Sequence, residues 1–240
     1  MGYAFIGDIH SQHEILGVAL DYCYNNELTP IFLGDVFDTH HRCGNAYQTY
    51  SLLREAQEDL GAIILRSNHH NKLERHLEGK VVRMSTNFVR TLKDFEEAGF
   101  DIANLKEWLL SFPYALVLTD YRGQEYRVAH AFFPSSLKVD HRNTLTKIFE
   151  VPRKVKDQLL YGPVVKDKNG KRCRLEWWKE PRNRGWKRVA GHYHVLHEDT
   201  HSLVLDGCLG GSELYTSDPR DELLALYDVD DQRLLTFGRV

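Results

Sequence analysis

The chain has 240 residues, of which 42% are hydrophobic, so it can bury a sizeable core and lies within the size range of one domain. Its formal net charge of −3 argues against a uniformly basic surface that would hold nucleic acid. The four cysteines are far apart and include no CxxC pair. They indicate neither a zinc knuckle nor a disulfide framework.

The N-terminal residues reach a polar motif at position 7 almost directly, which leaves no room for a signal peptide. No apolar run approaches the roughly 20 residues that a membrane span needs. We therefore expect a cytoplasmic protein without a membrane segment.

The first third of the chain alternates short apolar runs with helical periodicity. Residues 3–6, 31–33 and 62–65 are apolar runs that favour strands. Between them, residues 15–22 and 47–60 carry apolar side chains at helical spacing. This β-α-β order predicts a parallel sheet, with ligands collecting outside the carboxyl ends of its strands.

The middle of the chain, residues 71–112, has apolar positions typical of helices and is expected to form a cap beside those strand ends. Strand character then returns in five places, of which the last two are expected to be antiparallel. These predicted strands are residues 114–118, 126–128, 188–190, 203–205 and 223–229.

Residues 138–188 differ from the rest in charge. They contain 16 Lys or Arg and 6 Asp or Glu, a net charge of +10, whereas the remainder has 15 basic and 28 acidic residues, a net charge of −13. Aromatic residues within the segment would suit phosphate contacts combined with base stacking. The alternative is a solvated excursion that its tryptophans anchor to the core. We treat the segment as a basic, aromatic-containing insertion in one domain of residues 1–240.

Five short polar motifs occur in a fixed order, each just after a predicted strand. Any one of them has a structural explanation: Asp8 could cap a helix, and His130 could be a core histidine. Together they supply enough oxygen and imidazole ligands for two adjacent metal ions, and so predict a dinuclear metal hydrolase. The motifs are Gly7-Asp8-Ile9-His10, Gly34-Asp35-Val36-Phe37-Asp38, Ser67-Asn68-His69, Ala129-His130 and Gly191-His192-Tyr193-His194.

These motifs resemble those of the calcineurin-like metallophosphoesterases, and the resemblance extends over about residues 3–237. It implies an α/β fold of the α+β variant, a β-sandwich of mixed sheets flanked by helices. It also implies a phosphatase or phosphodiesterase that uses metal-activated hydroxide. Manganese is the first choice for the two divalent ions, and nickel, iron and zinc are the alternatives.

The same resemblance assigns a role to each motif residue. Asp35 would bridge the two ions. His69 would protonate the leaving oxygen, and Asp38 would orient His69. The remaining ligands would be Asp8, His10 and His194 for the first ion and Asn68, His130 and His192 for the second.

Within the family, the chain resembles the phosphatase domain of bacterial polynucleotide kinase-phosphatase and related phage phosphatases. The run Asn68-His69-His70-Asn71-Lys72-Leu73, the pair Thr91-Leu92 and the run that begins at Asp206 carry this likeness. It implies a bacterial or phage enzyme that hydrolyses phosphate monoesters, or 2',3'-cyclic phosphates, at nucleic-acid ends or on nucleotides. No obligate protein partner is indicated.

Some positions depart from the family pattern. Asp38-Thr39-His40 replaces the Asp-Arg-Gly of protein Ser/Thr phosphatases, so the arginine that grips phosphate is absent there. Ser67 replaces a glycine, and His70 replaces an acidic residue. The candidate substrate contacts are His40, His41 and Arg66, although the sequence favours solvated loop residues for the two histidines.

Two alternatives to a nucleotide or nucleic-acid phosphatase remain. One is a Ser/Thr phosphoprotein phosphatase of the same family. The other is a catalytically silent module that binds nucleic acid or protein through residues 138–188. Diester cleavage also stays open, because the second histidine of the last motif, His194, is often absent from the phosphatases that the chain resembles but usual in the wider phosphoesterase group.

Overall fold

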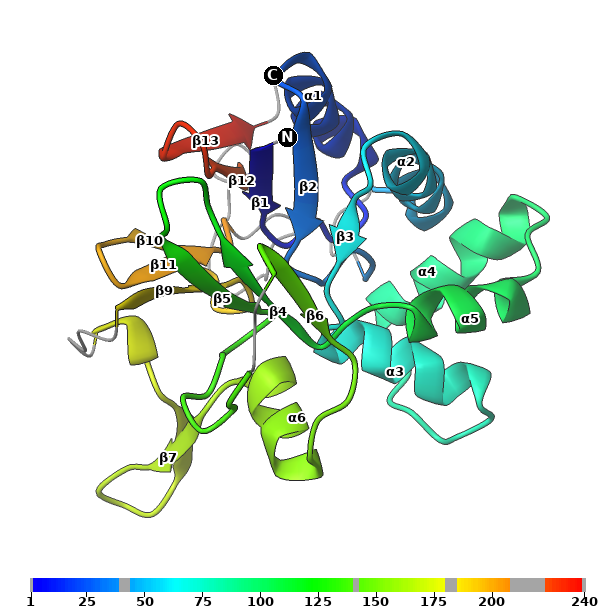
Figure 1. Ribbon diagram of the computed structural model, residues 1–240. Helices are drawn as coiled ribbons and strands as arrows, with labels where there is room; N and C mark the ends of the chain where they lie inside the picture. The colour runs from blue at the N-terminus through cyan, green and yellow to red at the C-terminus, as the bar shows by residue number, and fades with distance from the viewer. Residues whose placement is uncertain (1, 39–43, 140–142, 180–184, 208–222, 239–240) are drawn as a thin grey trace.

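Two mixed β-sheets pack face to face, and helices cover the outer face of each (Figure 1). The computed structural model describes residues 2–38, 44–139, 143–179, 185–207 and 223–238. The strand order is β13-β12-β1-β2-β3 in the first sheet and β10-β11-β9-β5-β4-β6 in the second. The predicted β-sandwich of mixed sheets flanked by helices is confirmed.

The first sheet contains the predicted parallel unit. Its strands β1, β2 and β3 run parallel, and β12 and β13 add antiparallel partners beside β1. Helices α1 and α2 connect the parallel strands. The bounds are β1 (Gly2–Ile6), α1 (His13–Asn25), β2 (Leu28–Phe32), α2 (Ala46–Asp59), β3 (Ile63–Ile64), β12 (Leu223–Asp228) and β13 (Arg233–Gly238).

The helical middle of the chain follows β3 directly and lies beside the first sheet (Figure 1). Phe37, which follows β2, packs edge-on against Phe95 of this layer at 5.6 Å between ring centroids. The expected cap therefore shares its core with the strand ends. It consists of α3 (Asn68–Leu77), α4 (Thr86–Glu97), η1 (Ile102–Asn104) and α5 (Leu105–Leu110).

The second sheet mixes parallel and antiparallel pairs. The expectation that residues 203–205 form an antiparallel strand is only half right, because β11 is antiparallel to β10 but parallel to β9. The chain runs back along the sheet in the short strand β10 and then reverses again, so β11 has the same direction as β9. The strands are β4 (Ala115–Thr119), β5 (Glu125–Ala129), β6 (Leu145–Ile148), β9 (Trp186–Ala190), β10 (Leu196–Glu198) and β11 (Ser202–Leu205).

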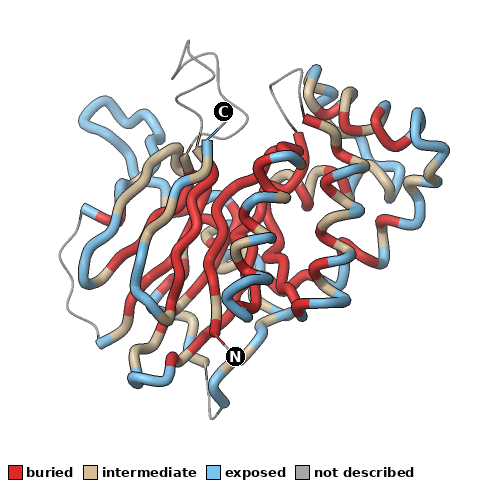
Figure 2. The backbone as a smooth tube through the Cα atoms, turned by 90° about the horizontal axis from the view of Figure 1, so that it is seen from above, coloured by how far each residue is buried: buried red, intermediate tan, exposed pale blue. Residues whose placement is uncertain are grey.

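The core between the sheets holds the inward side chains of both. Phe5 from the first sheet and Tyr126 from the second meet at 5.5 Å between ring centroids. Burial follows the strands, as Figure 2 shows in red. Because inward and outward positions alternate along a strand, each buried strand presents its alternate residues to the helices outside. The strand ends are thereby fixed from both faces.

Residues 138–188 divide into two structural parts. Strand β6, helix α6 (Arg153–Tyr161) and the short helix η2 (Trp177–Lys179) belong to the second sheet and its outer layer. Only β7 (Val164–Lys166) and β8 (Arg172–Arg174) form a separate, exposed hairpin. Trp177 and Trp178 are 3% and 6% exposed, so these two rings anchor the segment to the core.

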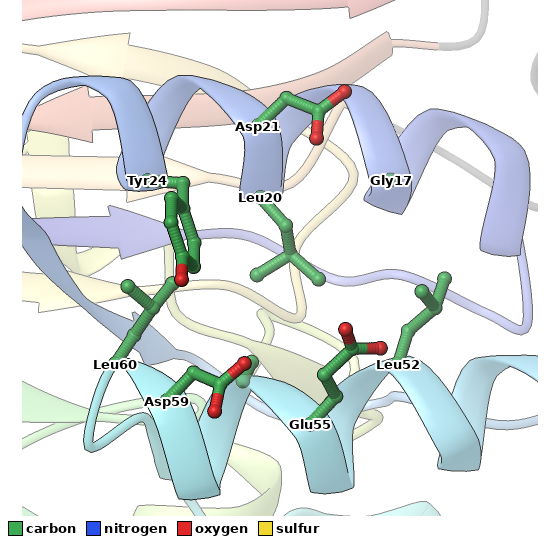
Figure 3. Close-up of a pocket in the computed structure, with 9 residues that line it drawn as sticks. Gly17, Leu20, Asp21, Tyr24, Leu52, Glu55, Asp59 and Leu60 are labelled. Carbon is green, nitrogen blue, oxygen red and sulfur yellow. The ribbon is translucent and has the colours of Figure 1, made fainter.

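A groove lies between α1 and α2, on the helix side of the first sheet (Figure 3). Leu20, Leu52 and Leu60 line it, and Asp21 and Glu55 stand at its edges. None of these residues belongs to the five motifs. Among the described residues, no helix is both long and apolar enough to cross a membrane.

The layer between the sheets should dominate stability. Replacing the fully buried Leu116 by alanine should lower the free energy of unfolding by about 2–5 kcal/mol, because it leaves a cavity between two rigid sheets. Leu110→Ala, at a side chain that is 47% exposed, should change it by less than about 0.5 kcal/mol. Urea denaturation of both variants measures the difference. Equal losses would contradict the assignment of the core.

Candidate metal centre

The first two motifs meet because β1 and β2 are parallel and end side by side, with Ile6 opposite Phe32. Two backbone hydrogen bonds join the loops that follow: the N–H groups of Ile9 and His10 donate to the Asp35 carbonyl at 3.2 and 2.8 Å. His10 and Asp35 adopt φ values of 48° and 39°, in the left-handed region that non-glycine residues rarely occupy. Both side chains thereby turn to the same side.

Two glycines allow the motifs to approach one another. A Cβ atom at Gly34, whose φ is 126°, would lie 2.6 Å from Nδ1 of His130. A Cβ atom at Gly191 would overlap a carboxylate oxygen of Asp8. Only glycine fits at both positions, so the second and fifth motifs depend on these residues for closure.

Three other potential ligands lie close to His130. Its Nδ1 lies 3.0 Å from the Leu33 carbonyl, so it carries the proton and leaves a lone pair on Nε2. That Nε2 lies 2.7 Å from Oδ1 of Asn68 and 3.0 Å from Nδ1 of His192. It lies 3.5 Å from Oδ2 of Asp35. These are the side chains expected to hold the second ion.

A second group of ligand atoms consists of Asp8, His10 and Asp35, all within 4.8 Å of one another. Nδ1 of His10 faces the carbonyl oxygens of Phe37 and Asp38 at 3.1 and 3.2 Å, which leaves its Nε2 as the free ligand atom. Asp35 belongs to both groups, because it also clusters with His130 and His192. That shared position is the one the bridging prediction requires.

The pKa values of the buried carboxylates depend on one another and on the histidines around them. Burial, and then the negative charges of Asp206 and Asp35, raise the pKa of Asp8 well above its usual value. Burial would also raise the pKa of Asp35, but the surrounding positive charges together hold it well below its usual value; they are those of His69, His130, His10 and His192. Among the described residues, Oδ1 of Asp8, Oδ1 of Asp35 and Nε2 of His192 are buried and have no hydrogen-bond partner. Unpartnered buried ligand atoms of these types fit divalent cations.

His194 lies at the margin of the first group. Its backbone N–H donates to Oδ2 of Asp206 at 2.7 Å, and its side chain is 33% exposed. Its charge contributes to the lowered pKa of His10, for which burial is the main cause. His194 is absent from both close groups of ligand atoms among the described residues, so its assignment to the first ion stays a prediction.

Asp206 is a residue of the site to which sequence reasoning gave no role. It is 1% exposed, follows the last residue of β11, and its charge acts on Asp8. The signal was present in the sequence, since a carboxylate directly after a buried apolar strand repeats the pattern of the first two motifs.

His69 and Asp38 form a hydrogen-bonded pair at the cap side of the centre. Nδ1 of His69 lies 2.7 Å from Oδ2 of Asp38, and its Nε2 lies 3.8 Å from Oδ2 of Asp35. Burial lowers the pKa of His69, but the negative charges of Asp35 and Asp38 outweigh burial and raise it to about 9. The ring therefore tends to hold a proton on each nitrogen.

The cap fixes the carboxylate of this pair. The hydroxyl of Thr91, in α4, donates to Oδ1 of Asp38 at 3.2 Å and accepts the Asp38 backbone N–H at 3.2 Å. Nζ of Lys72 lies 3.5 Å from Oδ2 of the same carboxylate and 3.1 Å from Oγ of Ser85. Asp38, at a φ of 66°, is thus held by two different helices.

The unusual Ser67 and His70 have a structural explanation. Ser67 caps α3: its hydroxyl accepts the His70 N–H, and Nδ1 of His70 accepts the Ser67 N–H, both at 3.2 Å. Such a capping box normally uses Glu or Gln where His70 stands. The pair fixes the start of the helix that carries Asn68 and His69.

The structure places Arg66 in the interior. Its guanidinium donates to the Tyr114 hydroxyl at 2.8 Å and to the Leu109 carbonyl at 3.0 Å, and it lies 3.5 Å from Glu74. These bonds occupy the group that was expected to contact substrate, so the arrangement gives that role no support. His40 and His41 lie outside the described residues.

Comparison with known proteins gives relatives that span the chain. It is 25% identical over 231 residues to bis(5'-nucleosyl)-tetraphosphatase PrpE (asymmetrical) of Bacillus subtilis (strain 168), with 89% of each chain covered. It is equally similar to the protein of that name from Bacillus velezensis, with 89% of this chain and 87% of the relative covered.

Solved structures share the fold. A candidate diadenosine tetraphosphatase matches with a TM-score of 0.63 and 15% identity, over 100% of this chain and 94% of that one. A protein serine/threonine phosphatase from Saccharomyces cerevisiae matches with a TM-score of 0.54 and 15% identity, over 100% and 80%. At these identities the likeness concerns the fold alone.

The family model described as calcineurin-like phosphoesterase matches residues 1–230, which include every motif described above. Its members are divalent-metal enzymes, and candidate ligands for such ions are present here. The chain therefore belongs to the calcineurin-like phosphoesterase family and is a phosphoester hydrolase.

Proposed function

We propose that the protein is a dinuclear-metal phosphohydrolase that acts on nucleotide phosphates, either free or at the end of a nucleic acid. The observation that carries the proposal is the sharing of Asp35 between two groups of ligand atoms. Two divalent ions that shared this carboxylate would lie close enough together to assist the transfer of a phosphoryl group to water. We take Mn²⁺ as the first ion to test, because mixed oxygen and imidazole ligands suit it.

Two bound divalent ions would supply positive charge to the phosphoryl oxygens and lower the pKa of bound water. The side chains described above would hold them, with Asn68, His130 and His192 on one side of Asp35 and Asp8 and His10 on the other. The protein's own contribution is then to orient the scissile phosphate and to manage a proton at the leaving oxygen.

His69 is the group we assign to that proton. Asp38 accepts from its Nδ1 at 2.7 Å, which fixes the ring and favours its protonated form. Nε2 faces the centre, 3.8 Å from Asp35, so a proton there can pass to the leaving oxygen as its bond to phosphorus breaks. Thr91 and Lys72 act through Asp38 and are positioning residues.

The substrate class rests on two considerations. The relatives that match 89% of this chain are called bis(5'-nucleosyl)-tetraphosphatases, which supports a nucleotide with several phosphates as substrate. In addition, Thr39 follows Asp38 where protein Ser/Thr phosphatases have arginine. No contact of the site favours a phosphoprotein or a silent module, and the special closeness to polynucleotide kinase-phosphatase stays a prediction.

A substrate panel tests the proposal. With Mn²⁺ bound, kcat/KM for diadenosine tetraphosphate or for RNA with a 3'-phosphate or 2',3'-cyclic phosphate should exceed that for a phosphoserine peptide by about tenfold or more. Asymmetric cleavage of the tetraphosphate would give ATP and AMP, which chromatography separates from ADP. Preference for the peptide would refute the nucleotide assignment.

The metal content of variants distinguishes residues that bind metal from the residue that donates the proton. His69→Ala should lower kcat by about 10²–10⁴-fold, because the leaving oxygen loses its acid, while metal content stays near that of the wild type. Asp35→Asn should lose both metal and activity. Elemental analysis and turnover of an aryl phosphate measure both effects. His76→Ala, on the same helix α3, is the matched histidine control, and loss of metal in the His69 variant would contradict its role.

The positioning role of Thr91 is tested by two substitutions. Thr91→Val keeps the shape but removes the hydroxyl that holds Asp38, so kcat should fall by about tenfold through misorientation of His69. KM and metal content should not change. Thr91→Ser keeps the hydroxyl and should retain most of the activity. If valine and serine behave alike, the hydrogen bond has no part in catalysis.

A further inference from the structure

The β7–β8 hairpin is a basic arm that projects from the body of the protein (Figure 1). All of residues 164–174 are exposed. Asp167, the one carboxylate among them, is used in the turn, where it accepts the N–H groups of Asn169 and Lys171 at 2.9 and 2.8 Å. In the part of the chain that the structure describes, none of the five cations of the arm forms an ion pair. They are Lys166, Lys168, Lys171, Arg172 and Arg174.

The base of the arm is fixed beside the metal centre. The N–H of Leu175 donates to the Pro163 carbonyl at 3.0 Å and closes the hairpin. Gly162, at a φ of 75°, lies against the hydroxyl of Tyr193, where any Cβ atom would clash. Tyr193 stands between His192 and His194 in the fifth motif. The arm thus begins at a contact with the residue that separates two predicted ligands.

Apolar packing makes this junction rigid. Leu175 and Tyr193 belong to one cluster with the buried Trp177 and Trp178. The rings of Tyr193 and Trp178 lie 4.7 Å apart at an interplanar angle of 66°. Because Arg174 is the residue before Leu175, its backbone is held at the edge of this cluster while its side chain is exposed.

Arg174 lies beside the fifth motif. The next residue, Leu175, packs in one cluster with Tyr193, which stands between the predicted ligands His192 and His194. An exposed arginine without an ion-pair partner, next to a phosphoester-hydrolysing site, can form paired hydrogen bonds with phosphate oxygens.

We propose that the arm binds phosphate groups of the substrate beyond the one that is hydrolysed, with Arg174 as the contact nearest the metal centre. This inference rests on the proposed action on nucleotide phosphates and names where the rest of the substrate lies. The arginine that protein Ser/Thr phosphatases have after the second motif is missing here. Arg174 would supply a positive charge from a different element, the β7–β8 hairpin.

The binding is electrostatic. The tryptophans that precede β9 in this region, Trp177 and Trp178, are buried and cannot stack on a base. The arm itself, residues 164–174, contains no aromatic residue. Affinity should therefore fall as salt rises, in proportion to the number of phosphates engaged.

Because of the arm's length, a dinucleoside tetraphosphate and a nucleic acid would contact different parts of it, although both carry phosphate groups. Each strand of the hairpin advances about 3.3 Å per residue, so the turn at Lys168 and Lys171 lies farther from the centre than Arg174 by roughly 10–20 Å. The short phosphate chain of a dinucleoside tetraphosphate would reach Arg174 but not the turn. A nucleic-acid backbone would reach both.

The test compares KM values of three variants on three substrates, with Mn²⁺ bound. Arg174→Gln should raise KM for diadenosine tetraphosphate and for a 3'-phosphorylated oligoribonucleotide by roughly three- to tenfold, with kcat unchanged. KM for p-nitrophenyl phosphate, which has one phosphate, should stay within about twofold. The double variant Lys168→Gln/Lys171→Gln should affect only the oligonucleotide. Arg54→Gln, at an exposed arginine of α2, is the charge-matched control.

Two outcomes overturn the proposal: an unchanged KM for every substrate, or an equal rise for p-nitrophenyl phosphate, which would assign Arg174 to the scissile phosphate. If the wild type hydrolyses no nucleotide, the proposed function fails while the arm is still judged by binding. Fluorescence anisotropy with a labelled oligothymidylate lacking terminal phosphates then decides. Weaker, less salt-dependent binding by Arg174→Gln supports the arm, and binding equal to that of the wild type refutes it.

Discussion

Three buried carboxylates lie close together where β1 and β2 of the first sheet and β11 of the second sheet end. Asp8, Asp35 and Asp206 are 2%, 3% and 1% exposed, and the charges of the last two raise the pKa of the first. Like charges buried together are unfavourable unless cations or protons offset them. His69 lies 3.8 Å from Asp35 and also pairs with Asp38. Bound divalent ions would offset the remaining negative charge, and the surrounding strands and loops hold the carboxylates in place.

The backbone carries part of the cost of that arrangement. His10, Asp35, Asp38, His192 and His194 all adopt φ values between 39° and 71°, a conformation that costs each non-glycine residue on the order of 1–3 kcal/mol. The two sheets and the cap hold the loops from several sides and keep them in this conformation. Gly34 and Gly191 then allow the motifs to touch. Rigidity of the sandwich is therefore a requirement of the site, because loops less constrained would relax away from the shared centre.

The sequence predicted the parts of the molecule that follow from periodicity and order. The β-α-β start, the cap and the assembly of the motifs at strand ends depend on local patterns, and they were found as expected. The role of Thr91 depends on a contact between distant segments, because Thr91 meets Asp38 across 53 positions. The direction of β11 depends on its choice of partner strand, and the burial of Trp177 depends on the second sheet. No single-sequence pattern encodes such choices.

The two sides of the centre carry different residues. The cap side holds the proposed catalytic pair, His69 and Asp38, and the opposite side carries the hairpin proposed to bind the substrate. On the cap side, Asp38 is held by Thr91 and Lys72, so His69, the proposed proton donor, is held in one orientation. On the opposite side, Tyr193 joins the centre to a hairpin whose cations have no protein partner among the described residues. Changes in the length or charge of that hairpin can alter which phosphates are held without moving a ligand atom. Under the proposed function, the residues beside Tyr193 would decide whether the centre holds short nucleotides or nucleic-acid ends.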